Sequence, residues 1–433
     1  MNKAYKYRIY PDEEQVILMS KTFGCCRLLY NSFLGWYNEA YKNFKENGIP
    51  IPKYPLVTFF KQQFPFMKEV DSFALMNARA NFIKALKNFF DSMKGKRKGK
   101  KVGFPKFKKK YKSRDAYTTN LVADKDGHAN IQLDEKANRI KLPKLGWVRI
   151  DYHRPISGII KHATVSRSKS GRYFVSIVVE TEREKPLVNK RANASHLKVC
   201  GNDLSMSKFI VSSEPEDDEN IKYERNYRKE EKILKRRHRQ FSKKQKGSNN
   251  KDKARLKLGR AYEKVTNRRR EFVIRVALYL ARKYDVIVLE DIDLQAMART
   301  LHLGKSVNDL GFGEFKRWLE YFAEKYDCTI VYADKWFASS KTCSVCGYKN
   351  TELTLNDREW VCPQCGTTHD RDRNAAINLR DLLYKEINTD GTSGIYACGD
   401  GTSTLREILG QVLSVSSGKL FVKQEKSSAI KTE

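Results

Sequence analysis

Two Cys-x-x-Cys motifs near the C-terminal end constrain the fold of this chain more than any other feature. Cys343 and Cys346 form the first motif, Cys362 and Cys365 form the second, and residues 347–361 lie between them. Each motif can turn back on itself and present two sulfurs to one ion, so four thiolates at this spacing suit tetrahedral Zn²⁺. Two motifs at this separation favour zinc over a redox-active cysteine pair. The pattern therefore predicts a zinc ribbon.

The charge of the chain indicates a polyanionic partner. Lys and Arg number 84 against 51 Asp and Glu in 433 residues, a formal net charge of +33. Aromatic residues lie among the basic ones, and such mixtures can neutralise phosphates and stack on bases. The sequence contains no His-Glu-x-x-His motif, phosphate-binding loop or dinucleotide fingerprint. We therefore expect a nucleic-acid-binding protein of several domains rather than an ordinary metabolic enzyme.

The remaining cysteines and the hydropathy pattern bear on the compartment. Five cysteines lie outside the two motifs, at spacings that form no disulfide framework, which favours a reducing interior. The N-terminus lacks an apolar signal core, and no run of about 18 apolar residues is present. We expect a soluble intracellular protein without a membrane partner.

The first half of the chain divides into helical and β-rich segments. Residues 1–10 alternate as a short strand that ends at Pro11, and apolar residues recur at helical spacing over 12–47 and 73–93. Residues 116–182 switch to period two with turns, which predicts hairpins and a small β-barrel. Between them, residues 94–112 contain eleven Lys or Arg and no acid, with glycines and a proline that prevent a regular helix.

Several basic side chains are candidate nucleic-acid contacts. Those in the predicted helices could equally form a solvated face, whereas the dense basic run repels itself unless an anion neutralises it. The candidates in the first half are Arg27, Arg79, Lys84, Lys96, Arg97, Lys98, Lys106, Lys108, Lys109 and Lys110. Those in the second half are Arg236, Arg237, Arg239, Lys243 and Lys244.

The second half predicts an α/β domain. Residues 199–213 read as strand, tight turn and strand, and residues 221–283 as a basic helical hairpin broken near Gly247. Two further buried strands are expected at 284–293, which ends in the acids Glu290, Asp291 and Asp293, and at 328–334. A helix is expected between them, near Phe312 to Tyr326. The thinly apolar first arm of the hairpin fits a helix along a phosphate backbone better than one buried in a core.

Three acids follow distinct elements of this domain. Asp203 ends one strand, Glu290 ends another, and Asp372 lies in the first turn of a helix. The carboxyl ends of parallel strands meet at one edge of a sheet, and carboxylates there can hold Mg²⁺ or Mn²⁺ for phosphodiester hydrolysis. Taken singly, Asp370 or Asp372 could instead cap the helix, and Asp291 or Asp293 could begin a turn. Together, in so basic a chain, they favour a catalytic metal site.

These motifs resemble one known family. The segments GNDLSMSKF, VIVLEDIDLQAM, WFASSKTCSVCG, REWVCPQCG and HDRDRNAAINL are similar to successive signatures of TnpB (OrfB) proteins, which insertion sequences encode. The opening KAYKYRIYP, the central VSRSKSGRYFVSIVVE and the tail SGIYACGDGTSTLRE are also similar, so the resemblance spans nearly the whole chain.

The resemblance implies an RNA-guided DNA endonuclease with an α/β and β multidomain fold. It implies an RNase H-like (RuvC) nuclease that cuts both strands, a guide RNA from the protein's own locus, target double-stranded DNA, and a cytoplasmic location near the nucleoid of a bacterium or archaeon. The sequence leaves the oligomeric state open, and we expect a monomer on the RNA. The implied domains are a WED-like β-barrel at 1–10 and 116–185, a helical recognition domain at 11–115, a RuvC-like domain at 198–342 and 367–384 with the basic hairpin 221–283, a zinc ribbon at 343–366, and a flexible tail at 385–433.

The resemblance also assigns roles and shows two departures. Asp203, Glu290 and Asp372 match the three catalytic acids, and Asp372 is preferred to Asp370 because it lies two residues before Asn374. The departures are Asn202, where family members usually have an apolar residue, and Ser205, where they usually have glycine. Two other functions remain open, a guided DNA-binding repressor with an inactive nuclease and a transposase that acts on element ends without RNA.

Overall fold

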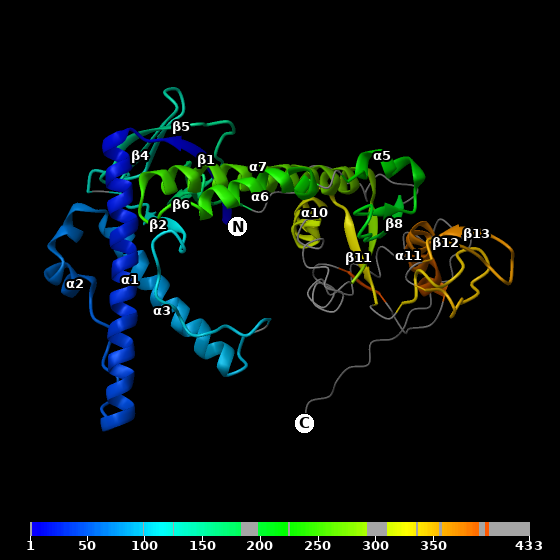
Figure 1. The fold of residues 1–433 in the computed structure, drawn as a ribbon, viewed down its shortest axis with the longest axis horizontal. Coiled ribbons are helices and arrows are strands. Elements are labelled where there is room, and N and C mark those ends of the chain that lie inside the picture. The colour runs from blue at the N-terminus through cyan, green and yellow to red at the C-terminus, as the bar shows by residue number, and fades with distance from the viewer. Residues whose placement is uncertain are drawn as a thin grey trace. The chain divides into compact units, whose positions relative to one another are not determined.

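The computed structural model describes residues 2–97, 99–123, 125–182, 198–223, 226–291, 310–334, 337–354, 357–388 and 395–397 (Figure 1). The chain divides into two compact units, Met1–Arg183 with Arg237–Ala261 and Glu184–Arg236 with Tyr262–Glu433. The predicted barrel and helical domains thus fall into one unit, and the basic hairpin is divided between both. None of the described helices combines the length and apolar character needed to cross a lipid bilayer.

A seven-stranded antiparallel sheet forms the centre of the first unit. Its strands are β1 Asn2–Tyr10, β2 Asp115–Asn120, β3 Gln132–Asp134, β4 Arg139–Leu142, β5 Gly146–Ile150, β6 Ile159–Arg167 and β7 Tyr173–Glu180, in the order β2-β6-β7-β1-β5-β4-β3. Alternate residues of β1, namely Tyr5, Tyr7 and Ile9, are buried, as period-two alternation requires. The predicted strands and hairpins are confirmed, and closure into a barrel stays a prediction.

Helices α1 Glu13–Asn47, α2 Val57–Gln63 and α3 Ser72–Met93, with the short 3₁₀ helix η1 Pro65–Glu69, complete the first core. Asp12 and Gln15 form a capping box at the start of α1, and Gly48 ends it at φ 66°. The rings of Phe33 on α1 and Phe82 on α3 stack with centroids 5.8 Å apart. The two long helices are confirmed, and the described part of 94–112 contains neither helix nor strand.

A five-stranded sheet forms the centre of the second unit. Its strands are β8 Val199–Asp203, β9 Val211–Ser212, β10 Val286–Glu290, β11 Thr329–Ala333 and β14 Ile395–Ala397, in the order β14-β11-β10-β8-β9. Strands β8, β10 and β11 are parallel, and β9 and β14 are antiparallel to their neighbours. The carboxyl ends of β8 and β10 therefore lie side by side at one edge.

Helices α7 Asn249–Lys283, α10 Phe312–Tyr326 and α11 Arg371–Asn388 cover the two faces of this sheet. The short helices η2 Pro215–Asp217 and α5 Asp218–Ile221 belong to the same unit, and α6 Asn226–Ser242 is divided between the two units. Ile287 and Leu289 of β10 pack with α7 and α10, whereas Val286 and Val288 pack with α11. Burial on both faces explains why these strands read as continuous apolar runs rather than alternating ones.

The C-terminal part differs from the prediction. A flexible tail was expected from residue 385, but α11 continues to Asn388, and β14 pairs with the edge of β11, with Ala397 opposite Val331. The strand is three residues long, too short for a periodic signal in the sequence. The rest of the predicted tail lies outside the described residues. Two other residues named in the sequence analysis, Lys98 and Asp293, also lie outside them.

Candidate active site and zinc ribbon

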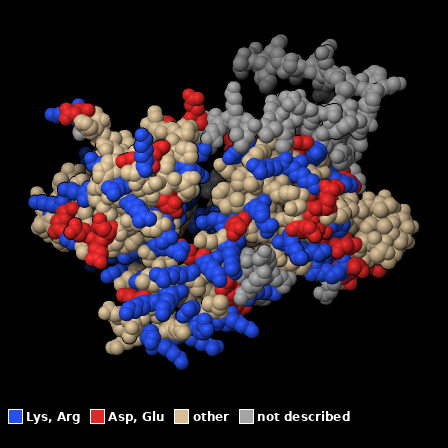
Figure 2. All heavy atoms as spheres, turned by 90° about the horizontal axis from the view of Figure 1, so that it is seen from above, with Lys and Arg blue, Asp and Glu red and all other residues tan. Residues whose placement is uncertain are grey.

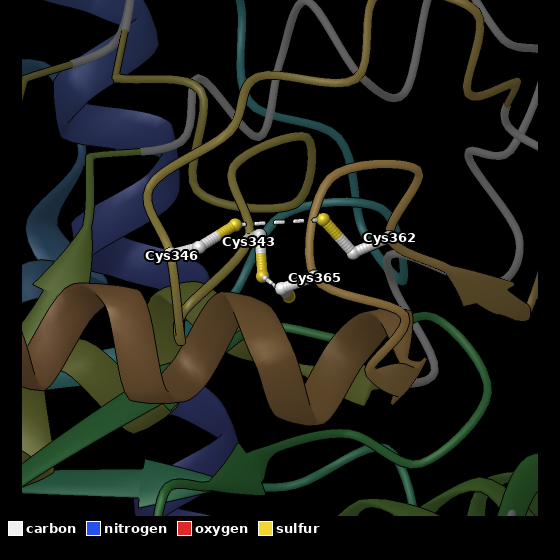
Figure 3. Close-up of side chains that lie close together, drawn as sticks. All are labelled: Cys343, Cys346, Cys362 and Cys365. Carbon is white, nitrogen blue, oxygen red and sulfur yellow. Dashed lines mark hydrogen bonds between the residues drawn. The ribbon is translucent and has the colours of Figure 1, made fainter.

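The four motif cysteines converge. One sulfur from each of Cys343, Cys346, Cys362 and Cys365 lies within 4.8 Å of the other three (Figure 3). Cys343 Sγ is 3.7 Å from Cys365 Sγ, and Cys346 Sγ is 3.5 Å from Cys362 Sγ. Four thiolates so close together fit the tetrahedral donor set of a structural zinc ion. The sequence prediction of a four-cysteine cluster is confirmed.

The two cysteine turns have the same backbone design. Gly347 and Gly366 follow them at φ 79° and 72°, the left-handed region that glycine tolerates. Their amides donate 2.9 Å hydrogen bonds to the carbonyls of Cys343 and Cys362. Strands β12 Glu359–Val361 and β13 Thr368–Asp370 form the hairpin that carries the second turn.

His369 is a site residue that the sequence argument missed. Its Nε2 lies 3.1 Å from Cys343 Sγ, and its ring packs on Trp360 with centroids 4.9 Å apart. Burial lowers the pKa of His369, so a neutral imidazole with its proton on Nε2 can donate to the Cys343 thiolate. The only sequence signal was its place three residues after the second Cys-x-x-Cys-Gly, inside a segment quoted for its acids.

The three predicted acids meet at one edge of the second sheet. Asp203 is the last residue of β8, and Glu290 is the last residue of the adjacent parallel strand β10, whose Leu289 lies opposite Asn202. Asp372 lies in the first turn of α11 and is buried. Helix α11 packs directly on β8, since a Cβ at Gly201 would lie 2.0 Å from the carbonyl oxygen of Ala376. Residues separated by 169 positions in the chain are thereby brought together.

The pKa values of two of these carboxyls are raised. Burial, followed by the negative charges of Asp372 and Glu290, raises the pKa of Asp203 to about 8, although the Arg371 guanidinium opposes the shift. Burial also raises the pKa of Glu290, against the influence of Lys316. The negative charges of Asp372 and Glu290 act on Asp203, and a divalent cation such as Mg²⁺ or Mn²⁺ held by these carboxylates would offset that charge.

Asp372 is held by three side chains. The Ser205 hydroxyl donates a 2.9 Å hydrogen bond to its Oδ2, and Arg371 and Arg358 approach its two oxygens at 3.3 and 3.5 Å. Ser205 lies just after β8, and Arg358 lies just before β12 of the ribbon. The Ser205 departure therefore adds a direct hydrogen bond to the third acid.

Asp370 has a different structural role. Its Oδ1 accepts a 2.8 Å hydrogen bond from the amide of Arg373, which makes it the N-terminal cap of α11. Its other oxygen pairs with Lys208 at 3.3 Å. The capping alternative thus applies to Asp370, and the buried acid of the cluster is Asp372.

Asn202 and Asp291, which the sequence also singled out, lie next to Asp203 and Glu290 in the chain. Asn202 is fully buried, and its Nδ2 donates to Cys200 Sγ at 3.1 Å. Its Oδ1 accepts no hydrogen bond from any described residue, so only half of the amide is satisfied. Asp291 pairs at 3.7 Å with Lys316, the lysine whose charge also acts on Glu290.

The basic candidates separate into engaged and exposed groups. Arg27 pairs with Asp115 at 3.5 Å, Arg79 donates to the carbonyl of Pro55 at 3.1 Å, and the Lys108 ammonium lies 3.8 Å from the Tyr30 ring centroid. The exposed candidates are Lys84, Lys96, Arg97, Lys106, Lys109, Lys110, Arg236, Arg239, Lys243 and Lys244, while Arg237 is half-buried. Lys and Arg side chains cover much of the face drawn in Figure 2.

Three family models match the chain. Residues 312–379 match "Cas12f1-like, TNB domain", and residues 176–301 match the OrfB model of IS605 elements, described as "Probable transposase". Residues 1–46 match a "Helix-turn-helix domain" of the same OrfB proteins, although here they form β1 and most of one continuous helix, α1. The fold and site thus define a class of insertion-sequence proteins in which a zinc ribbon adjoins an α/β sheet edged by carboxylates.

Full-length relatives identify the family. The chain is 31% identical to a "Putative RNA-guided DNA endonuclease" of Streptomyces pristinaespiralis, over 99% of this chain and 97% of the relative. It is 28% identical to "Putative RNA-guided DNA endonuclease InsQ" of Escherichia coli K12, over 87% and 91%. The chain belongs to the TnpB (OrfB) family of IS605-type insertion sequences, as its motifs predicted.

Two solved structures are similar at lower levels. A Cas12f1–sgRNA–target DNA complex is 14% identical with a TM-score of 0.32, over 88% of this chain and 99% of that one. CasPhi-2 (Cas12j) bound to crRNA and phosphorothioate DNA is 11% identical with a TM-score of 0.42, over 88% and 91%. Neither score supports a detailed superposition.

Proposed function

We propose that this protein is an RNA-guided, divalent-metal-dependent endonuclease that hydrolyses phosphodiester bonds in target double-stranded DNA and so maintains its insertion sequence. The observation that carries the proposal is the cluster of Asp203, Glu290 and Asp372 at one sheet edge, in a chain with a net charge of +33. The names of its relatives from Streptomyces and Escherichia coli, both called RNA-guided DNA endonucleases, support the guided part of the proposal.

The sheet supports a RuvC-like nuclease. Strands β11, β10 and β8 are parallel and β9 is antiparallel, an arrangement compatible with an RNase H-type domain. Asp203, Glu290 and Asp372 would hold Mg²⁺ or Mn²⁺, and the ions would supply activation of water and stabilisation of the departing oxygen. Ser205 and Arg371 orient Asp372, and the burial of that carboxylate limits the water that competes for it.

The first unit would bind nucleic acid. We assign the β-rich module of residues 1–10 and 116–185 to the guide RNA scaffold, and the helices within 11–115 to the guide–target duplex and the motif beside the target. The exposed lysines around Lys109 and the exposed cations near Arg239 would contact phosphates. The four-cysteine ribbon would hold zinc beside the nuclease edge.

Cleavage of a labelled duplex by protein co-expressed with RNA from its own locus, in Mg²⁺, tests the proposal. We expect guide-dependent cutting that Asp203→Ala and Asp372→Asn abolish. Asp370→Asn is the matched control, because asparagine also caps helices and the residue lies outside the acid cluster. This variant should retain most of the cleavage activity.

The other readings give different results in the same assay. Guide-dependent binding without cutting would indicate a repressor, and cutting or joining that needs no RNA would indicate a transposase that acts directly on element ends. Either result would reject the guided nuclease. Loss of activity in Asp370→Asn but not in Asp372→Asn would reject the choice of third acid.

A further inference from the structure

A buried asparagine of α11 binds the first cysteine turn. Asn374 Nδ2 donates to the carbonyl of Thr342 at 2.7 Å, and its Oδ1 accepts from the amide of Ser344 at 3.0 Å. Thr342 and Ser344 are the two neighbours of Cys343. The side chain is 1% exposed, so its amide is satisfied by the backbone on either side of a zinc ligand.

A second asparagine, one turn later, repeats the contact. Asn378 Nδ2 lies 2.6 Å from the carbonyl of Thr342 and 2.8 Å from that of Ser339. Residues four apart share one face of a helix, so Asn374 and Asn378 present two amides to the same ribbon segment. In Figure 3 the orange helix that runs beside the four cysteines is α11.

The ribbon also fixes the start of the helix. Strand β13 ends at Asp370 and α11 begins at Arg371 with no loop between them. The Arg371 amide donates to the carbonyl of Arg358 at 2.8 Å, and His369 lies 3.1 Å from Cys343 Sγ. Asp372 is therefore attached to the ribbon on both sides, by β13 before it and by Asn374 after it.

The other two acids have a different support. Asp203 and Glu290 are ends of paired parallel strands, whose hydrogen bonds do not involve the ribbon. If the cysteine turns lose their ion, Asn374 and Asn378 lose ordered backbone partners in a buried environment, which is unfavourable. The first turn of α11 would then shift, and Asp372 would move relative to the other two acids.

We propose that Asn374 and Asn378 are positioning residues that couple zinc binding in the ribbon to the placement of Asp372 in the acid cluster. This inference rests on the proposed function, since it takes both metal sites as real. Zinc then acts as a distant structural requirement for divalent metal binding at the sheet edge.

A double-mutant cycle tests the coupling. Cys346→Ser removes an exposed zinc ligand, and Asn374→Ala removes the side-chain amide that binds the first cysteine turn. A third variant carries both substitutions. Asn374→Asp, which keeps an acceptor for Ser344 and loses the donor to Thr342, serves if Asn374→Ala does not fold. Zinc content is measured by mass spectrometry, and Mn²⁺ affinity by electron paramagnetic resonance, on full-length protein purified with its RNA.

We expect Asn374→Ala to retain zinc yet bind Mn²⁺ about 10-fold more weakly, a fall typical of lost outer-shell support. Zinc-free Cys346→Ser should show a similar fall, and the double variant should be no weaker than either single variant. Asn350→Ala is the matched control, because this ribbon asparagine hydrogen-bonds locally to the Glu352 amide, and its zinc and Mn²⁺ binding should be unchanged.

Two results would overturn the coupling. The first is a zinc-free Cys346→Ser variant that binds Mn²⁺ with wild-type affinity. The second is a double variant whose loss of Mn²⁺ affinity equals the product of the two single losses, because independent effects multiply. If Asp203→Ala binds Mn²⁺ as well as the wild-type protein does, the acids do not hold the ion. That result would reject the proposed function, and the coupling with it. The two failures are therefore distinguishable.

Discussion

At the scale of single residues, neighbouring acids in one short segment have opposite surroundings. Asp370 and Asp372 lie on either side of Arg371, and spacing could not decide between a cap and a metal ligand. The structure separates them by contact, since Asp370 caps α11 and Asp372 is buried against Ser205. The types and positions of Asp203, Glu290 and the cysteines were predictable from strand ends and motif spacing. The His369 contact was not, because it depends on how the hairpin folds back.

Ser205→Ala should weaken the site without unfolding the domain. The hydroxyl donates to Asp372 at 2.9 Å, and a hydrogen bond to a charged group contributes about 1.5–3 kcal/mol. We expect Mg²⁺ to be needed at a concentration about 10-fold higher for half-maximal cleavage. Ser205→Thr retains a hydroxyl and should recover most of the loss; equal defects in both variants would argue that volume, rather than the hydrogen bond, matters.

The acid cluster also predicts a dependence on pH. Burial and two neighbouring carboxylates raise the pKa of Asp203 to about 8. The metal-free folded protein keeps this proton between about pH 4 and pH 8 while the unfolded chain releases it, so stability should fall as pH rises through that window. Mn²⁺ competes with the proton, and its affinity should rise over the same range.

Thermal unfolding with and without Mn²⁺ at several pH values measures both trends. Asp203→Asn cannot titrate and should flatten the pH dependence of the metal-free protein. A metal-free stability that rises steadily from about pH 5 to pH 8, as for a salt-bridged carboxylate, would contradict the raised pKa.

At the scale of elements, long periodic segments were predicted well and short ones were not. The helix expected near Phe312 to Tyr326 has those bounds as α10, because its apolar residues repeat at helical spacing. Strand β14 has three residues and is held by pairing with β11, a long-range contact without a local signal. The order of the seven-stranded sheet likewise depends on contacts between distant segments.

The packing of α11 on β8 gives a prediction for Gly201. A Cβ there would lie 2.0 Å from the Ala376 carbonyl and 2.5 Å from the Arg380 amide, both backbone atoms that cannot move freely. Gly201→Ala should destabilise the second unit by about 1–3 kcal/mol in denaturant unfolding. Gly35→Ala in α1, where a Cβ meets nothing within 4 Å, should instead stabilise by about 0.5–1 kcal/mol. Similar stability of the two variants would count against the close packing.

At the scale of the whole molecule, the net charge of +33 was the feature most directly read from sequence. Domain boundaries were harder to predict, since the seven-stranded sheet and helices α1 and α3 share one core and the basic hairpin is divided between units. A pattern of apolar residues shows that a segment is buried, but not which other segment it packs against. A boundary between two units that share a helix therefore cannot be recognised from the local sequence.

The charge predicts how binding should respond to salt. Lys106, Lys109 and Lys110 are exposed, and replacing all three by Gln should weaken binding to RNA from the protein's own locus and reduce the salt slope by about one per lost phosphate contact. Dissociation constants over a series of KCl concentrations measure the slope. Lys42→Gln, which removes a cation paired with Glu46 on α1, is the control. An unchanged slope in the triple variant would place the RNA elsewhere.

The position of Asp372 on α11, the last helix among the described residues, has a consequence for synthesis. Asp203 and Glu290 leave the ribosome long before it, and the ribbon that supports Asp372 is made immediately before α11. If the protein is the nuclease that we propose, a nascent chain can complete its first unit while the acid cluster still lacks Asp372. Chains that stop early, at a nonsense codon or a stalled ribosome, would then bind nucleic acid without cutting it, and would compete with finished copies of the protein.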